Sequence, residues 1–413
     1  LYDLPFIVIL MGMAALVMFV PAMHALVIDD HPTSRAFFYS GLLFVALSGM
    51  VALATANFGI RRQGRSHLIS ILAFFAVLPV MLAVPLTEAV QDTSFRNAYV
   101  EMVSSLTTTG MTLFEPDRLP PSVHLWRALV GWLGGFFLWV TAVAVLAPLN
   151  LGGFEVSSPA EIGQGAAVGT QQIDRVADVS ERLRRFTLSL APIYGGLTLF
   201  LAVTLMFLGE VPLVAVCHAM ATLSTSGISP VGGMQSANVS VMGEIMILIF
   251  FVFALSRLTF SADERADGWT SLGRDPELRF GALIIVSLSL LLFLRHWAAT
   301  FEDGAEITLS EGLRGLWGAV FTVTSFLTTT GFESVHWSSA QAWSGFTSPG
   351  VLLLGLAVFG GGVATTAGGV KLLRVYALYK HGMREMEKLV QPSSIGGAGQ
   401  FARRFRRQGA YVA

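Results

Sequence analysis

The chain has 413 residues, of which 54% are hydrophobic and only 13% are charged. Soluble domains carry charge on about a quarter of their residues, so this composition excludes an ordinary soluble protein. The formal net charge of −1 says little about partners, and the single cysteine, Cys217, excludes an internal disulfide and a multi-cysteine metal site.

Long apolar blocks predict an all-α polytopic membrane protein, because a helix needs about 20 apolar residues to cross a bilayer. Leu4–Ile28 and Ala36–Ile60 predict two introductory helices joined by a short polar turn. Six further crossings are expected at His67–Pro85, Leu125–Leu149, Phe186–Leu208, Val241–Leu258, Phe280–Leu294 and Pro349–Leu378.

Three apolar segments between these crossings are too short to span. They are Asn97–Leu106, Leu213–Leu223 and Leu316–Leu327, and each runs into hydroxyl residues closed by Thr-x-Gly. The closing glycines lie 117 and 104 residues apart (227 − 110 and 331 − 227). Repeated units of this kind are found in membrane pores and carriers. The residues concerned are Thr107, Thr108, Thr109, Gly110, Ser224, Thr225, Ser226, Gly227, Thr328, Thr329, Thr330 and Gly331.

These residue types suit a potassium filter. Such a filter replaces the water around the ion with backbone carbonyls, and threonine adds a hydroxyl oxygen. Glycine permits the backbone conformations that turn successive carbonyls toward one axis. A short preceding helix directs its partly negative C-terminal end at the cation. A single turn of this kind could equally be an ordinary helix stop, but three copies at corresponding places favour a filter.

The distribution of basic residues indicates the orientation. With these crossings, 20 of the 26 Lys and Arg residues fall on one side of the membrane. The positive-inside rule places that side in the cytoplasm and the three filters toward the exterior. The other side carries only Arg35, Arg96, Arg118, Arg127, Arg295 and Arg314.

Several longer motifs resemble those of the Trk/Ktr/HKT superfamily of potassium transporters, and most closely its Trk-type membrane subunits (TrkH/TrkG-like). Residues 106–110 and 327–331 both read Leu-Thr-Thr-Thr-Gly. Gly360-Gly361-Gly362 and the run from Thr365 to Arg374 resemble the family's third return segment, and Arg384–Pro392 resembles the linker that follows it. The resemblance covers almost the whole chain.

This resemblance implies a potassium-conducting pore of pseudo-fourfold symmetry, with K⁺ bound at the filter residues and no organic cofactor in this chain. It implies a homodimer in the bacterial cytoplasmic (inner) membrane, gated by a cytoplasmic TrkA-type nucleotide-binding ring. Within the superfamily a serine in the first filter accompanies sodium permeability, so Gly110 favours potassium. The glycine-rich segment would be a movable gate loop, formed by Gly360, Gly361, Gly362, Thr365, Thr366, Gly368 and Gly369. The alternative for that segment is a helix surface whose glycines let a neighbouring helix pack closely against it.

The sequence departs from the family in having three filters. The repeat interval predicts a fourth glycine beyond Ala413, so the chain is expected to lack the fourth pore unit. Thr366-Ala367-Gly368 cannot be the fourth filter, because too few residues separate it from Gly331 for two crossings. The expected divisions are 1–66 (introductory pair), 67–160, 161–270 and 271–380 (pore units 1, 2 and 3), and 381–413 (a cytoplasmic connector).

Isolated charges are open to more than one interpretation. Lys371 and Arg374 could be gating charges or could reach the cytoplasmic interface. The basic run Arg403–Arg407 favours contact with anionic membrane lipid over nucleic acid, because it follows a membrane crossing. Structural hydrogen bonding is expected of Glu101 and His218, Glu244 is left undecided, and an outer-mouth role or a solvated rim is expected of Glu115, Asp117 and Glu333.

Two rival functions remain at this stage. A symporter coupled to H⁺ or Na⁺ would also have internal repeats and broken helices, and a Na⁺-permeable member of the same superfamily is a variant of the pore. An intramembrane enzyme would need paired catalytic side chains or a metal cluster. The chain has no H-E-x-x-H or G-x-S-x-G motif and no paired catalytic Asp, so an enzyme is not expected.

Overall fold

A computed structural model describes residues 6–55, 71–146, 179–237, 239–256, 275–303, 309–345 and 348–390. Within these ranges every regular element is helical, and no strand occurs. Six of the described helices are long and apolar enough to cross a membrane, which confirms the expected all-α polytopic membrane protein. They are Ile7–Val27, His31–Thr55, Ile71–Ala89, Pro121–Leu146, Arg182–Phe207 and Pro276–Arg295.

The chain forms two compact units. The first comprises Leu1–Phe137 with Ile193–Gly243, and the second comprises Leu138–Pro192 with Glu244–Ala413. The expected boundaries of the pore units therefore stay a prediction. The basic loops around Arg61–Arg65, Arg175, Arg257–Arg274 and Arg403–Arg407 lie outside the described residues.

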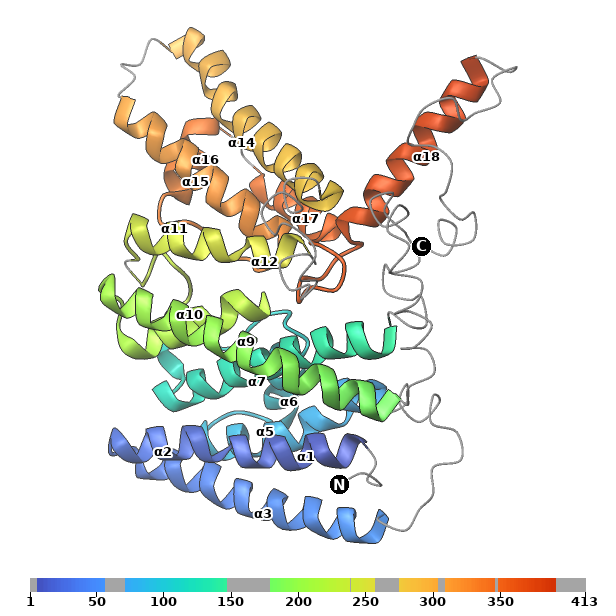
Figure 1. Ribbon diagram of the computed structural model, residues 1–413. Coiled ribbons are helices and arrows are strands. Elements are labelled where there is room, and N and C mark those ends of the chain that lie inside the picture. Colours follow the sequence, from blue (N-terminus) through green and yellow to red (C-terminus); the bar gives the residue numbers. More distant parts are fainter. Residues whose placement is uncertain are drawn as a thin grey trace. The chain divides into compact units, whose positions relative to one another are not determined.

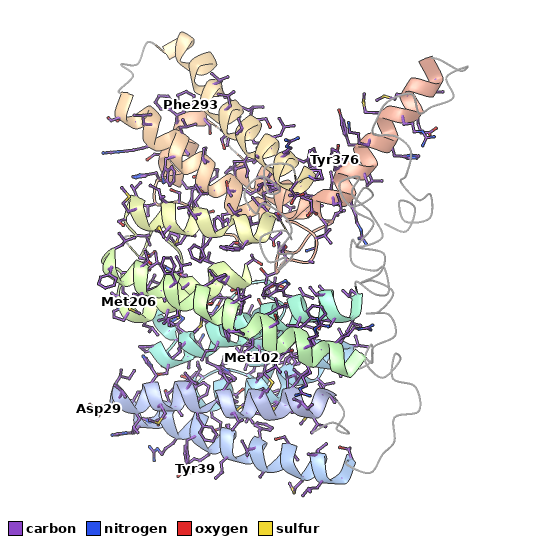
Figure 2. All side chains as sticks on the ribbon, viewed as in Figure 1. Asp29, Tyr39, Met102, Met206, Phe293 and Tyr376 are labelled. Carbon is purple, nitrogen blue, oxygen red and sulfur yellow. The ribbon has the colours of Figure 1, made fainter. Side chains whose placement is uncertain are left out.

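In the first unit, α1 (Phe6–Val17) and α2 (Phe19–Val27) run alongside α3 (His31–Thr55), as Figure 1 shows. This pairing corresponds to the predicted introductory helices. The Tyr39 side chain is 63% exposed and points away from the pair (Figure 2), as expected of a lipid-facing surface. The other elements of this unit are α5 (Leu78–Ala89), α6 (Phe95–Leu106), η1 (Pro116–Arg118), most of α7 (Pro121–Thr141), the second half of α9 (Val179–Phe207) and α10 (Pro212–Ser224).

In the second unit, α14 (Pro276–Asp303) packs against α15 (Leu309–Leu327) and α16 (Trp337–Ser344). Phe293 of α14, labelled in Figure 2, stacks on Trp343 with ring centroids 5.7 Å apart. The unit also contains the π-helical turn η2 (Ala142–Leu146), most of α11 (Val241–Phe250), α12 (Val252–Leu255), α17 (Pro349–Phe359) and α18 (Leu372–Val390).

Two of the short helices match the prediction closely, whereas the third differs. α15 begins at Leu309 rather than Leu316, and Glu311 in its first turn favours a helix N-terminus there. That first turn is polar, which explains why the apolar pattern alone located only the second half of the helix. The sequence reasoning also missed α16, a short helix that follows the third Thr-x-Gly.

Packing in the first unit can be tested at two adjacent phenylalanines of α3. Phe37 is fully buried against Trp126, with ring centroids 5.5 Å apart, whereas Phe38 is 48% exposed. Lipid is as apolar as a protein core, so only the cavity part of the usual cost of Phe→Ala applies, roughly 2 kcal/mol. We expect Phe37→Ala to lower the unfolding temperature in detergent and Phe38→Ala to change it little. Equal effects would contradict this packing.

Candidate functional site

Three helices end in the same turn. In the first copy the N–H of Thr108 donates to Ser105 O (3.0 Å) and that of Thr109 to Ser104 O (2.9 Å). These two bonds define the Schellman motif, which satisfies carbonyls at the end of a helix. Each turn also places hydroxyls two residues apart within hydrogen-bond distance. The corresponding bonds are Thr225 N to Thr222 O (3.3 Å) and Ser226 N to Ala221 O (2.9 Å) after α10, and Thr329 N to Phe326 O (3.1 Å) and Thr330 N to Ser325 O (2.9 Å) after α15.

A threonine occupies the left-handed position in all three turns. The φ angles of Thr108, Thr225 and Thr329 are 56°, 53° and 59°. Glycine is the usual residue at this position of the motif, and a β-branched side chain there costs roughly 1–2 kcal/mol. Backbone strain of this kind concentrates at functional sites. The recurrence of threonine where glycine is easier indicates that the side chain itself is required.

The hydroxyls on either side of that threonine are paired. The Oγ1 atoms of Thr107 and Thr109 lie 2.8 Å apart, and those of Thr328 and Thr330 lie 3.0 Å apart. In the second copy the Ser224 hydroxyl donates to that of Ser226 at 3.0 Å. Each turn therefore gathers hydroxyl oxygens and backbone carbonyls, which are ligands suited to a dehydrated alkali cation.

The first two turns lie side by side in the first unit. A side chain at Gly110, whose φ is +72°, would overlap the carbonyl oxygen of Ser226. The glycines of α7 allow equally close contact with the helix ends, since a Cβ on Gly134 would overlap Leu106 O and one on Gly135 would approach Ser224. The third turn belongs to the second unit and has the same backbone form, with Gly331 at φ +84°.

The return segment of the third copy is broken where the glycines occur. α17 ends at Phe359 and α18 begins at Leu372, so residues 360–371 form a non-helical loop that contains the predicted gate loop, residues 360–369. Side chains at Gly361 and Gly362 would overlap the backbone of Ala254 and Leu255. The Gly362 N–H donates to Ala254 O (2.9 Å). These contacts account for the glycines as positions of close backbone approach in a broken helix.

The gate loop is attached to the third filter turn and to α14. The Gly368 N–H donates to Thr329 Oγ1 at 2.7 Å, so the strained threonine binds the loop directly. The Val363 N–H donates to Glu277 Oε1 at 3.0 Å. The Lys371 ammonium donates a hydrogen bond to the carbonyl of Ala367 in the same loop. This contact differs from the interpretation in which the Lys371 side chain extends to the cytoplasmic interface of the membrane.

Buried ionisable groups surround the turns and are hydrogen-bonded. Glu101 of α6 pairs with Arg127 of α7 at 2.6 Å (Oε1 to Nε). Glu244 of α11, left undecided from the sequence, accepts bonds from Trp317 Nε1 (2.6 Å), Ser334 Oγ (3.0 Å) and Val335 N (2.6 Å). These bonds give Glu244 a structural role. The carboxylates of Glu115, Asp117 and Glu333 belong to exposed residues.

Spanning helices combined with short helices that end in hydroxyl-rich turns, and with a broken return helix, define a membrane ion-transport protein. The chain belongs to the TrkH family of cation transport proteins, whose family model matches residues 33–409. This assignment confirms the predicted family and the prediction of a transporter rather than an enzyme.

Relatives of known function cover most of the chain. It is 29% identical over 385 residues to the Trk system potassium uptake protein TrkH of Escherichia coli K12, an alignment that covers 92% of this chain and 74% of that protein. It is 31% identical over 335 residues to TrkH of Halomonas elongata, covering 79% and 62% of the two chains. The crystal structure of the potassium transporter TrkH from Vibrio parahaemolyticus shares the fold, with a TM-score of 0.78 at 24% identity and coverage of 98% and 80%.

The Glu101–Arg127 pair can be tested by comparing single and double substitutions. Glu101→Ala leaves Arg127 buried without its partner, which costs roughly 3–5 kcal/mol. The double substitution Glu101→Ala/Arg127→Leu removes the orphaned charge, so we expect it to recover at least half of that loss. Thermal unfolding in detergent measures both. A double variant less stable than Glu101→Ala would contradict the pairing.

Proposed function

We propose that this protein takes up potassium ions across the bacterial cytoplasmic membrane through a gated pore lined by the filter turns. The relatives named above are potassium uptake proteins, and six apolar helices agree with a multi-pass protein of the inner membrane. The observation that carries the proposal is the recurrence of one strained turn, with a left-handed threonine and paired hydroxyls, at the end of three helices.

In this proposal the twelve filter residues replace the hydration shell of K⁺. Each turn, in the expected pore units 67–160, 161–270 and 271–380, contributes carbonyl and hydroxyl oxygens as ligands of the ion, and the resemblance implies a fourth such turn. The C-terminal end of each short helix points its partial negative charge at the ion. Because the ion regains in the filter the oxygen contacts it had in water, potassium passes without a large desolvation cost.

The gate loop controls access to the filter from the cytoplasmic side. Its link to the filter is the bond from Gly368 N–H to Thr329 Oγ1, and its anchor on α14 is the bond to Glu277. Lys371 and Arg374 lie where the loop meets α18, so they act as gating charges that follow its movement. A gated pore is proposed over a symporter because the recurring hydroxyl-rich turns are the feature expected of an ion filter.

Partners follow from the family rather than from the described residues. We propose a homodimer and a cytoplasmic TrkA-type nucleotide-binding ring, in keeping with the word system in the names of the relatives. Anionic lipid is the proposed partner of the basic cytoplasmic residues.

Selectivity tests the filter assignment. Gly110→Ser adds a side chain at a positive φ and against Ser226 O, which displaces the first filter. We expect the K⁺/Na⁺ permeability ratio of the native protein in liposomes to fall about tenfold, corresponding to about 1.4 kcal/mol. Gly209→Ser is the matched control, because Gly209 also has a positive φ (+101°) but has open space around it. An unchanged K⁺/Na⁺ permeability ratio in Gly110→Ser would contradict the assignment of this turn to the filter.

Ion flux tests the gate loop. A Cβ at Gly362 would meet the Leu255 carbonyl, so Gly362→Ala should shift the loop away from α12 and raise potassium flux about fivefold, the effect of roughly 1 kcal/mol on a two-state equilibrium. Deleting Ala364, Thr365 and Thr366 should raise it further. Gly355→Ala in α17 is the control, because open space surrounds that glycine. Unchanged flux in correctly folded variants would argue against a gate.

A further inference from the structure

One position on each short helix carries a buried polar side chain at the same distance from the filter. Glu101, His218 and Thr322 each precede a filter glycine by nine residues (110 − 101, 227 − 218 and 331 − 322). All three residues are fully buried. Their side chains differ in chemistry, so the shared position is not explained by one conserved residue type.

Each of these side chains bonds to the chain just beyond its own filter. We call residues 111–114, 228–231 and 332–335 the post-filter segments. The Leu113 N–H donates to Glu101 Oε2 at 2.9 Å, and the Ser334 N–H donates to Thr322 Oγ1 at 3.1 Å. Leu113 and Ser334 are both the third residue after their filter glycine.

The second copy makes the same link through a hydroxyl. Ser229, the second residue after Gly227, lies 3.0 Å from His218 Nε2 through its Oγ. His218 Nδ1 lies 3.1 Å from Glu210 Oε2. A carboxylate can only accept, so Nδ1 carries the proton, and in the neutral ring Nε2 is then the acceptor. In all three copies, therefore, a buried polar side chain on the short helix is hydrogen-bonded to the post-filter segment.

A second buried group reinforces each link. Arg127 holds Glu101 by an ion pair, and Glu210 holds His218. In the third copy Glu244 binds the same post-filter segment, through the Ser334 hydroxyl and the Val335 N–H. Groups held in this way keep their rotamers when an ion enters or leaves, because moving them would break a buried hydrogen bond.

The geometry of the helix explains how a residue at this position holds the post-filter segment. Each of these residues lies five or six positions before the end of its helix (106 − 101, 224 − 218 and 327 − 322), which is about 8–9 Å back along the axis at 1.5 Å per residue. The post-filter segment must therefore run back beside the helix to reach it, with the filter turn held between its two fixed ends. Three ordinary core hydrogen bonds would not be expected to share both the donor segment and the acceptor position.

We propose that Glu101, His218 and Thr322 are positioning residues that fix the post-filter segments and thereby set the selectivity of the filters for potassium over sodium. The proposal rests on the proposed function, because it assigns these residues a part in ion discrimination. They act through the turns and do not touch the ion. Loosening a link allows the filter carbonyls to close around the smaller cation.

Thr322 offers the sharpest test, since valine has the same shape and lacks only the hydroxyl. We expect Thr322→Val to lower the K⁺/Na⁺ permeability ratio of the native full-length protein in liposomes roughly fivefold, the factor that corresponds to about 1 kcal/mol for one hydrogen bond. Thr322→Ser keeps the acceptor and should restore the ratio. The matched control is Thr324→Val, because Thr324 is also buried on α15 but its hydroxyl donates to Val320 of the same helix.

The outcomes separate this inference from the function it rests on. Ser229→Ala removes the hydrogen-bond partner of His218 in the second copy and should lower the ratio similarly, which keeps the test valid if Thr322→Val does not fold. Potassium-selective current in the wild type and Thr324→Val, with an unchanged ratio in Thr322→Val or in Ser229→Ala, overturns the positioning role alone. A wild-type protein that carries no potassium current overturns the proposed function and the positioning role together.

Discussion

Within a membrane, every backbone N–H and C=O must be satisfied by protein or by water in a cavity. A helix that stops partway across leaves carbonyls without partners, and this protein resolves the problem three times with a Schellman turn. The turn requires one residue in the left-handed conformation, and the protein uses threonine there despite the strain. The strained threonines therefore lower the stability of the fold at the three places where hydroxyl and carbonyl oxygens lie close together. Backbone strain at such places is expected of an ion-binding site.

Close packing around the turns depends on the absence of side chains. Gly134 and Gly135 of α7 allow the ends of α6 and α10 to touch that helix, and Gly361 and Gly362 allow the gate loop to touch the backbone of α12. Small residues serve this purpose in membranes, where van der Waals contact rather than the hydrophobic effect drives association. The same glycines leave residues 360–369 with few bulky side chains, as the proposed movement of that segment requires.

Buried charge is arranged to hold structure rather than to meet the ion. Glu101, Glu210 and Glu244 each have a partner among the described residues. Because a lone charge in this setting is costly, each acid occurs with a cation, an imidazole or several donors. The consequence is a rigid support around turns that would otherwise be held only by their own strained backbone.

The sequence by itself determined the membrane class, six of the eight expected crossings, the three Thr-x-Gly turns and the broken return helix, because apolar length and glycine punctuation are local signals. The crossings expected at Val241–Leu258 and Pro349–Leu378 are not among the described spanning helices, because the first consists of two short helices, α11 and α12, and the second is broken between α17 and α18. It also located two of the three short helices, and it placed α15 too late because the first turn of that helix is polar. The left-handed threonines, the bond from the gate loop to Thr329 and the role of Glu244 required the tertiary structure. The last two of these features join residues up to 91 positions apart, such as Glu244 and Val335, and a hydrogen bond between distant segments depends on how the chain returns upon itself, which no local pattern specifies. The left-handed threonines are a local feature, but the usual preference for glycine at that position of the turn argues against them.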